Sequence, residues 1–84
     1  MKYRIEFAPR ALKQLDKIPA KVRERIALRI DSLAGGLGGD VKRLKSFSPA
    51  YRLRVGDYRV LFDLESGIIV IHRIGHRKDI YDRP

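Results

Sequence analysis

Residues 51–59 read YRLRVGDYR and place three arginines in alternation with apolar side chains. The GD dipeptide between the two runs is typical of a two-residue hairpin turn. With that turn, Arg54 lies opposite Arg59, and Arg52 lies on the same face of the hairpin. Like charges directly opposite each other destabilise a strand pair by about 0.2–1 kcal/mol. The pattern therefore indicates either a solvated face or, because arginine forks suit phosphate oxygens, a face that binds an anion.

A second group of candidate residues lies in the segment RIGHRKDIY, residues 73–81. It supplies the titratable His76, the cation Arg77 and the phenol of Tyr81, after a glycine that permits close backbone approach. The segment follows a strongly apolar run, so we expect it at the end of a central strand, beside the hairpin. Taken alone, His76 reads as an ordinary surface histidine; together with the arginines it becomes a site candidate. His72, inside the apolar run, is interpreted as a packed or hydrogen-bonded side chain rather than a catalyst.

The elements that must position these residues follow from hydrophobic periodicity. Alternation over residues 3–7 predicts a half-buried strand, and Pro9 is placed to open a helix in its first turn. Pro19 separates that helix from a second, and the glycine-rich residues 35–39 read as a flexible linker, since the GK[ST] of a phosphate loop is absent. Residues 50–55, 58–64 and 68–71 read as strands.

The prediction is an α+β fold, β-α-α-β-β-β, with an antiparallel sheet packed against an N-terminal helical hairpin. The apolar stripes of the two helices are Ala8, Leu12, Leu15 and Ile18, and Val22, Ile26, Ile30 and Leu33.

Size and charge limit the classes of function. A chain of 84 residues fits one domain, 1–84, and 44% hydrophobic residues are too many for a disordered chain. The absence of cysteine excludes disulfides and thiolate ligands, and no run suits a signal peptide or a membrane helix, so we expect a soluble cytoplasmic protein. The net charge of +9 favours a polyanionic partner: nucleic acid, an acidic protein or anionic lipid. A merely solubilising surface is the alternative, but residues 41–59 hold six cations and only one carboxylate, Asp57.

The hairpin YRLRVGDYRVLF, the preceding KRLKS and the ending IGHRKDIY resemble the RelE toxins of the RelE/ParE superfamily of toxin–antitoxin systems. The resemblance implies a microbial-ribonuclease-like fold and an endoribonuclease that cleaves messenger RNA in the ribosomal A site. It also implies a RelB-like antitoxin with an acidic toxin-binding segment, in a toxin–antitoxin hetero-oligomer. Well-studied members have lysine at the positions of Arg52 and Arg54. The candidate catalytic residues are Arg52, Arg54, Arg59, His76, Arg77 and Tyr81, and the candidate RNA-binding cations are Lys42, Arg43, Lys45 and Lys78.

The chemistry expected of this set is transesterification without a metal or other cofactor, because no HEXXH or Cys/His cluster is present. Arginines hold the phosphate and stabilise the charge of the phosphorane. Arginine stays protonated and cannot serve as a base. Nearby cations favour the phenolate of Tyr81, which becomes the base or an orienting group, while His76 assists as a proton donor.

Two other classes of function compete with this interpretation. One is a ParE-like toxin that inhibits DNA gyrase through protein contacts without cutting nucleic acid. The other is a plain nucleic-acid-binding module, although no base-reading or aromatic stacking motif supports it. For either toxin, we expect an antitoxin to dock on the helical hairpin or on the sheet edge at Tyr3–Phe7, by groove filling or strand addition.

Overall fold

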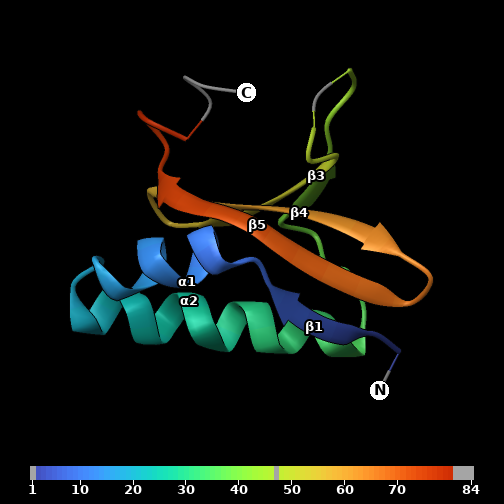
Figure 1. The fold of residues 1–84 in the computed structure, drawn as a ribbon, viewed down its shortest axis with the longest axis horizontal. Helices are drawn as coiled ribbons and strands as arrows, with labels where there is room; N and C mark the ends of the chain where they lie inside the picture. The colour runs from blue at the N-terminus through green and yellow to red at the C-terminus, as the bar shows by residue number, and fades with distance from the viewer. Residues whose placement is uncertain (1, 47, 81–84) are drawn as a thin grey trace.

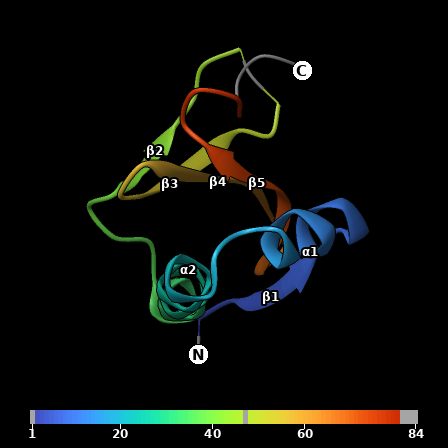
Figure 2. The same cartoon turned by 90° about the vertical axis from the view of Figure 1, so that its left-hand side faces the viewer.

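The computed structural model describes residues 2–46 and 48–80, and these form two helices and a five-stranded sheet. The elements are β1 (Arg4–Phe7), α1 (Pro9–Asp16), α2 (Ala20–Ser32), a 3₁₀ turn (Leu33–Gly35), β2 (Val41–Arg43), β3 (Tyr51–Val55), β4 (Tyr58–Glu65) and β5 (Ile68–His76). Both views of the ribbon place α1 and α2 on one side of the sheet, with the β2–β3 connection on the other side (Figures 1 and 2). The predicted α+β class and helical hairpin are therefore confirmed. Among the described residues, no helix is long and apolar enough to cross a membrane.

Prolines set the boundaries of the two helices. Pro9 occupies the first turn of α1, where a missing N–H costs nothing, and Pro19 is the N-cap residue of α2. The guanidinium of Arg23 donates to the carbonyl oxygens of Asp16 and Ile18, and so ties the second helix to the connection. One member of the predicted apolar stripe, Leu12, is 48% exposed instead of buried.

The sheet order is β1-β5-β4-β3-β2. Strands β2 to β5 pair antiparallel as predicted, but β1 pairs parallel to β5, so the sheet is mixed at this edge. The helical hairpin between β1 and the remaining strands is the kind of long crossover that a parallel pair requires. The prediction that residues 3–7 form a sheet edge is confirmed, because β1 has a neighbour on one side only.

Strand β2 was not predicted from the sequence. Its three residues, VKR, are too few to show alternation, and Val41 is the single apolar residue among them. The strand forms because it pairs with β3, with Val41 opposite Leu53 and Lys42 opposite Arg52.

A bulge in β5 decides which of its residues face the helices. Leu61 pairs with Arg73 and Phe62 pairs with Ile71, so His72 is the extra residue. The buried isoleucines accordingly fall at 69, 71 and 74, with one spacing of three. The N–H of Ile74, just past the bulge, donates to Oε1 of Gln14 on α1 at 2.8 Å. The strand continues to His76, five residues beyond the predicted apolar run. The extra residue at the bulge shifts the alternation by one position, so that Ile74 faces the core.

The core lies between the sheet and the helices, where Phe62, Ile69 and Ile71 pack with Ile26 and Ile30. A smaller apolar cover lies on the opposite face of the sheet. There Leu61 is fully buried and Ile80 is 2% exposed. Ile80 lies close to Gly75, because a Cβ added to the glycine would be 3.2 Å from Cδ1 of Ile80. Residues 77–80 therefore fold back over the face that carries the arginines.

Candidate nucleic-acid interface

The β3–β4 hairpin has the register predicted from its turn. Val55 pairs with Tyr58, Arg54 pairs with Arg59, and Arg52 pairs with Leu61. The alternating residues Leu53, Val55, Val60 and Phe62 are buried against the helices. The arginines are consequently on the sheet face that the helices leave uncovered.

Strand pairing extends this face into two rows of side chains across the sheet. The first row runs Lys42, Arg52, Leu61, Arg73, and the second runs Arg54, Arg59, Gly75. We call the cations of these rows, Lys42, Arg52, Arg54, Arg59 and Arg73, the arginine face. Arg73 was missed as a site residue because an unbroken alternation from Ile69 and Ile71 would turn it toward the core, and only the bulge turns it outward.

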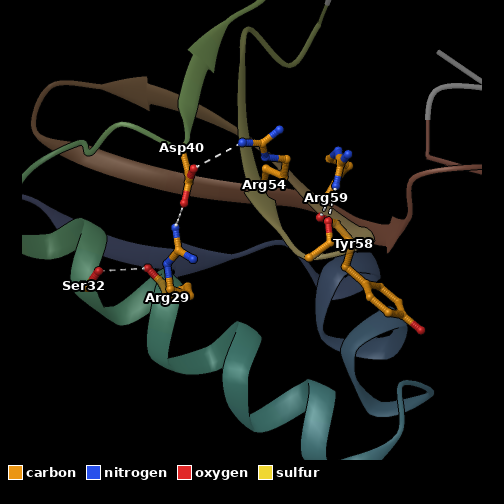
Figure 3. Close-up of polar contacts among 7 residues, drawn as sticks. Arg29, Ser32, Asp40, Arg54, Tyr58 and Arg59 are labelled. Carbon is orange, nitrogen blue, oxygen red and sulfur yellow. Dashed lines mark hydrogen bonds and ion pairs between the residues drawn. The ribbon is translucent and has the colours of Figure 1, made fainter.

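One carboxylate offsets part of this charge. Asp40 forms ion pairs with Arg29 of α2 and with Arg54 of β3, the latter at 3.7 Å (Figure 3). The hydrogen bond from Arg29, together with the positive charges of Arg29 and Arg54, holds the pKa of Asp40 below its ordinary value. The Asp40 carboxylate thus fixes one edge of the arginine face and links it to α2.

The hairpin turn gathers three further guanidinium contacts. Arg59 donates to the carbonyl oxygens of Gly56 and Tyr58 at 2.8 and 2.9 Å (Figure 3). Arg77 donates its backbone N–H to the carbonyl of Asp57 at 2.7 Å, and its Nε lies 3.6 Å from the Asp57 carboxylate. The guanidinium of Arg25 lies beside Gly56, where an added Cβ would be 3.6 Å from its Nη1. Arg59, Arg77 and Arg25 thus all contact the same hairpin turn, at residues 56–58.

His76 is not brought together with the arginines. It pairs with Tyr58, and their rings meet edge to face with centroids 5.5 Å apart. Because directly paired residues share a face, His76 is on the side of Tyr58, opposite to Arg59 (Figure 3 shows Tyr58 and Arg59 leaving the hairpin in different directions). Its Nδ1 accepts a hydrogen bond from the N–H of Lys78 at 3.1 Å.

The remaining predicted residues are spread over several places. Tyr81 lies outside the described residues; its neighbour Ile80 packs on the arginine face. Lys42 belongs to the arginine face, whereas Arg43 is on the other face, with its guanidinium 5.8 Å from the ring centre of Tyr51. Lys45 and Lys78 are exposed in connections.

His72 lies beside a carboxylate at the bulge of β5. Its Nε2 lies 3.3 Å from Oδ2 of Asp63, and Oδ1 of the same carboxylate accepts the backbone N–H of Ala50 at 2.8 Å. Within residues 2–46 and 48–80, no group of three or more His, Cys, Asp or Glu side chains is arranged to hold a metal ion.

The structure combines a mixed sheet, two helices on one of its faces and a cationic opposite face, and comparison with known proteins identifies the family. The model of the ParE toxin family of type II toxin–antitoxin systems matches residues 5–81. The chain belongs to this RelE/ParE family of toxins. It is 34% identical to toxin RelE3 of Methanocaldococcus jannaschii, over 94% of this chain and 96% of the relative. It is 30% identical to toxin RelG of Mycobacterium tuberculosis, over 99% of this chain and the whole relative.

Solved structures show the same fold. The RelB–RelE antitoxin–toxin complex from Methanococcus jannaschii matches with a TM-score of 0.77 and 34% identity, over 92% of this chain and 95% of that chain. The archaeal RelE–RelB complex from Pyrococcus horikoshii OT3 matches with a TM-score of 0.79 and 26% identity, over 94% and 99%.

Proposed function

We propose that this toxin is an endoribonuclease that cleaves messenger RNA in the ribosomal A site and so inhibits translation. The observation that carries the proposal is the direct opposition of Arg54 and Arg59 on a sheet face that also holds Arg52. This arrangement costs stability in the free protein and gives it a fixed set of forked donors for phosphate oxygens. The reaction class follows from the resemblance to RelE toxins.

The residues on this face supply charge stabilisation. The 2′-hydroxyl of RNA attacks the adjacent phosphorus, the bond to the 5′-oxygen breaks, and a 2′,3′-cyclic phosphate forms. Arg52, Arg54, Arg59 and Arg77 hold the phosphate and neutralise the charge that develops on it. Arg59 and Arg77 are suited to this because contacts to the turn at residues 56–58 hold them before substrate arrives.

The proton transfers need other groups, because the guanidinium ions stay protonated. We assign Tyr81 to accept or orient the proton of the 2′-hydroxyl, because it is a phenol in a strongly basic segment of the sequence, and neighbouring cations favour the phenolate. His76 projects from the other face of the sheet and has no contact with the scissile phosphate, so the departing 5′-oxygen takes its proton from water. A site with so weak a base relies on geometry that the ribosome imposes on the messenger.

The 2′-hydroxyl attack can be tested with a messenger that carries a single 2′-deoxynucleotide at the scissile position of the A-site codon. We expect the toxin to leave the substituted codon intact and to cut the all-ribose control, giving a 5′-hydroxyl end. Cleavage of the deoxy-substituted codon, or products with 5′-phosphate ends, would contradict the transesterification.

The cognate partner is proposed to be a RelB-like antitoxin with an acidic segment, because two matched structures are RelB–RelE complexes and this chain carries a charge of +9. The structure offers an apolar groove of about 390 Å³ between β1 and α2, next to the free edge of β1. Ile5, Phe7, Ala27 and Leu28 are among its lining residues, and Leu28 is 66% exposed. A helix or strand of the antitoxin can dock there.

A second candidate function is inhibition of DNA gyrase through protein contacts, which the description of the matching family model as a ParE toxin favours. Against it stands the arginine face, which contact with a protein target does not require. A supercoiling assay separates the two: inhibited gyrase with intact messenger would support the alternative.

A further inference from the structure

A pocket of about 310 Å³ lies at one end of the arginine face. Its lining joins the start of α1, the connection before β3, and strands β4 and β5. The residues are Ala8, Arg10, Ser48, Pro49, Asp63, His72 and Arg73. In the proposed reaction, none of these residues holds the scissile phosphate.

The pocket is continuous with the arginine face. Arg73 belongs to both, because it stands in the row of Arg52 and also lines the pocket. Asp63 lies four residues beyond Arg59 along β4, which at about 3.3 Å per residue is roughly 13 Å. A strand of RNA whose scissile phosphate contacts Arg59 can therefore reach the pocket with a phosphate about two nucleotides away.

The polar groups of the pocket suit an anion. Two guanidinium groups, Arg10 and Arg73, and the hydroxyl of Ser48 are donors. The single carboxylate, Asp63, already accepts the N–H of Ala50 through one oxygen and contacts His72 through the other. Both oxygens of the Asp63 carboxylate are therefore next to nitrogen atoms of the protein.

We propose that the Arg10–His72–Arg73 pocket is a second phosphate subsite, which binds a phosphodiester of single-stranded RNA about two nucleotides from the one that is cut. The inference rests on the proposed function and extends it: the toxin contacts more than one phosphate of its substrate. Arg10 is the residue to vary, because it is exposed on α1 and its replacement leaves the sheet intact.

The test is the salt dependence of binding to 2′-O-methyl RNA oligonucleotides of two to eight nucleotides, which cannot undergo the cleavage reaction. Removal of one contact to a phosphate lowers the slope of log affinity against log salt by about 0.7 for single strands. We expect Arg10→Ala to lower the slope by about that amount for the octamer and to leave the dinucleotide unaffected. The matched control is Lys13→Ala, an exposed cation of the same helix that does not line the pocket.

Equal octamer slopes for Arg10→Ala and Lys13→Ala, with the parent protein still binding RNA, would overturn the subsite and leave the proposed function standing. A parent protein that binds none of the oligonucleotides would also overturn the subsite, whereas the proposed function is overturned only by intact messenger on programmed ribosomes. If Arg10→Ala weakens binding of a poly-glutamate peptide and leaves the RNA slopes unchanged, the pocket serves a protein partner and the assignment to RNA is wrong.

Discussion

Arg54 and Arg59 face each other directly across the β3–β4 hairpin, on the side of the sheet that the helices do not cover. Two guanidinium ions at paired positions repel each other, and one nearby carboxylate, Asp40, contacts only the first of them. The repulsion between Arg54 and Arg59 therefore lowers the stability of the hairpin and contributes nothing to its fold.

That cost can be measured by a double-mutant cycle. We predict an unfavourable coupling of about 0.2–1 kcal/mol between Arg54 and Arg59 in the free energy of unfolding at low salt. The measurement is urea unfolding of the parent, Arg54→Thr, Arg59→Thr and the double variant. The coupling should shrink at high salt because exposed charges are screened. A favourable coupling at low salt would show instead that the pair stabilises the hairpin.

The position of His76 leads to a prediction about catalysis. His76→Gln should cleave messenger close to the parent rate, because this side chain lies with Tyr58 on the face away from the arginines. Tyr81→Phe should lose about 10²-fold or more, the usual contribution of a general base. Both are measured as single-turnover cleavage on programmed ribosomes. The reverse order of effects would assign the proton transfer to His76.

Asp40 should make the stability of the toxin depend on acid. Its pKa is lowered in the folded protein, first by the hydrogen bond from Arg29. The unfolded chain therefore binds a proton at higher pH than the folded chain. The stabilisation is present above the ordinary pKa of an aspartate and is lost as the pH falls through the lowered one.

The corresponding measurement is urea unfolding between about pH 6 and pH 2. We predict a weaker loss of stability in acid for Asp40→Asn than for the parent. Asp31→Asn, an exposed aspartate of α2, is the matched control and should follow the parent. If Asp40→Asn loses stability as steeply as the parent, the ion pairs with Arg29 and Arg54 are absent in solution.

The groove between β1 and α2 predicts how the antitoxin is held. Leu28→Glu should weaken the complex with the cognate antitoxin roughly fivefold or more, as expected when about 1 kcal/mol of apolar burial is removed from an interface. Leu12→Glu introduces the same charge at a second exposed large apolar residue, outside the groove, and should bind like the parent. Titration calorimetry gives both affinities. Equal losses in the two variants would indicate a general charge effect and no docking in the groove.

The sequence allowed much of the hairpin to be predicted because its turn fixes the register and its alternation fixes the faces. Arg52, Arg54 and Arg59 could therefore be placed on one face from the sequence alone. The side of His76 could not be predicted, because it depends on the bulge at His72, where one extra residue reverses the alternation of β5. The same bulge turned Arg73 outward and hid it from the sequence pattern.

Tertiary pairing accounts for the other differences. β2 forms because Val41 pairs with Leu53 of β3. It could not be predicted, because three residues are too few to show a periodic pattern. The parallel pairing of β1 with β5 is likewise decided by where the two helices return the chain. Arg25 and Asp40 lie at the candidate site because Arg25 of α2 approaches Gly56 and Arg29 of α2 pairs with Asp40. No local sequence pattern reveals such contacts between distant elements.

In vitro translation of a defined messenger with primer extension tests the ribonuclease site most directly, when the parent toxin is compared with Arg59→Ala and Arg4→Ala. Arg4 is an exposed arginine at the far edge of the sheet, ion-paired with Glu6, and serves as the control for loss of one positive charge. We predict breaks at A-site codons that require ribosomes, unchanged in Arg4→Ala and reduced about 10²–10³-fold in Arg59→Ala. Intact messenger with the parent toxin, or equal cleavage by the parent and Arg59→Ala, would contradict the assignment of the arginine face as the ribonuclease site.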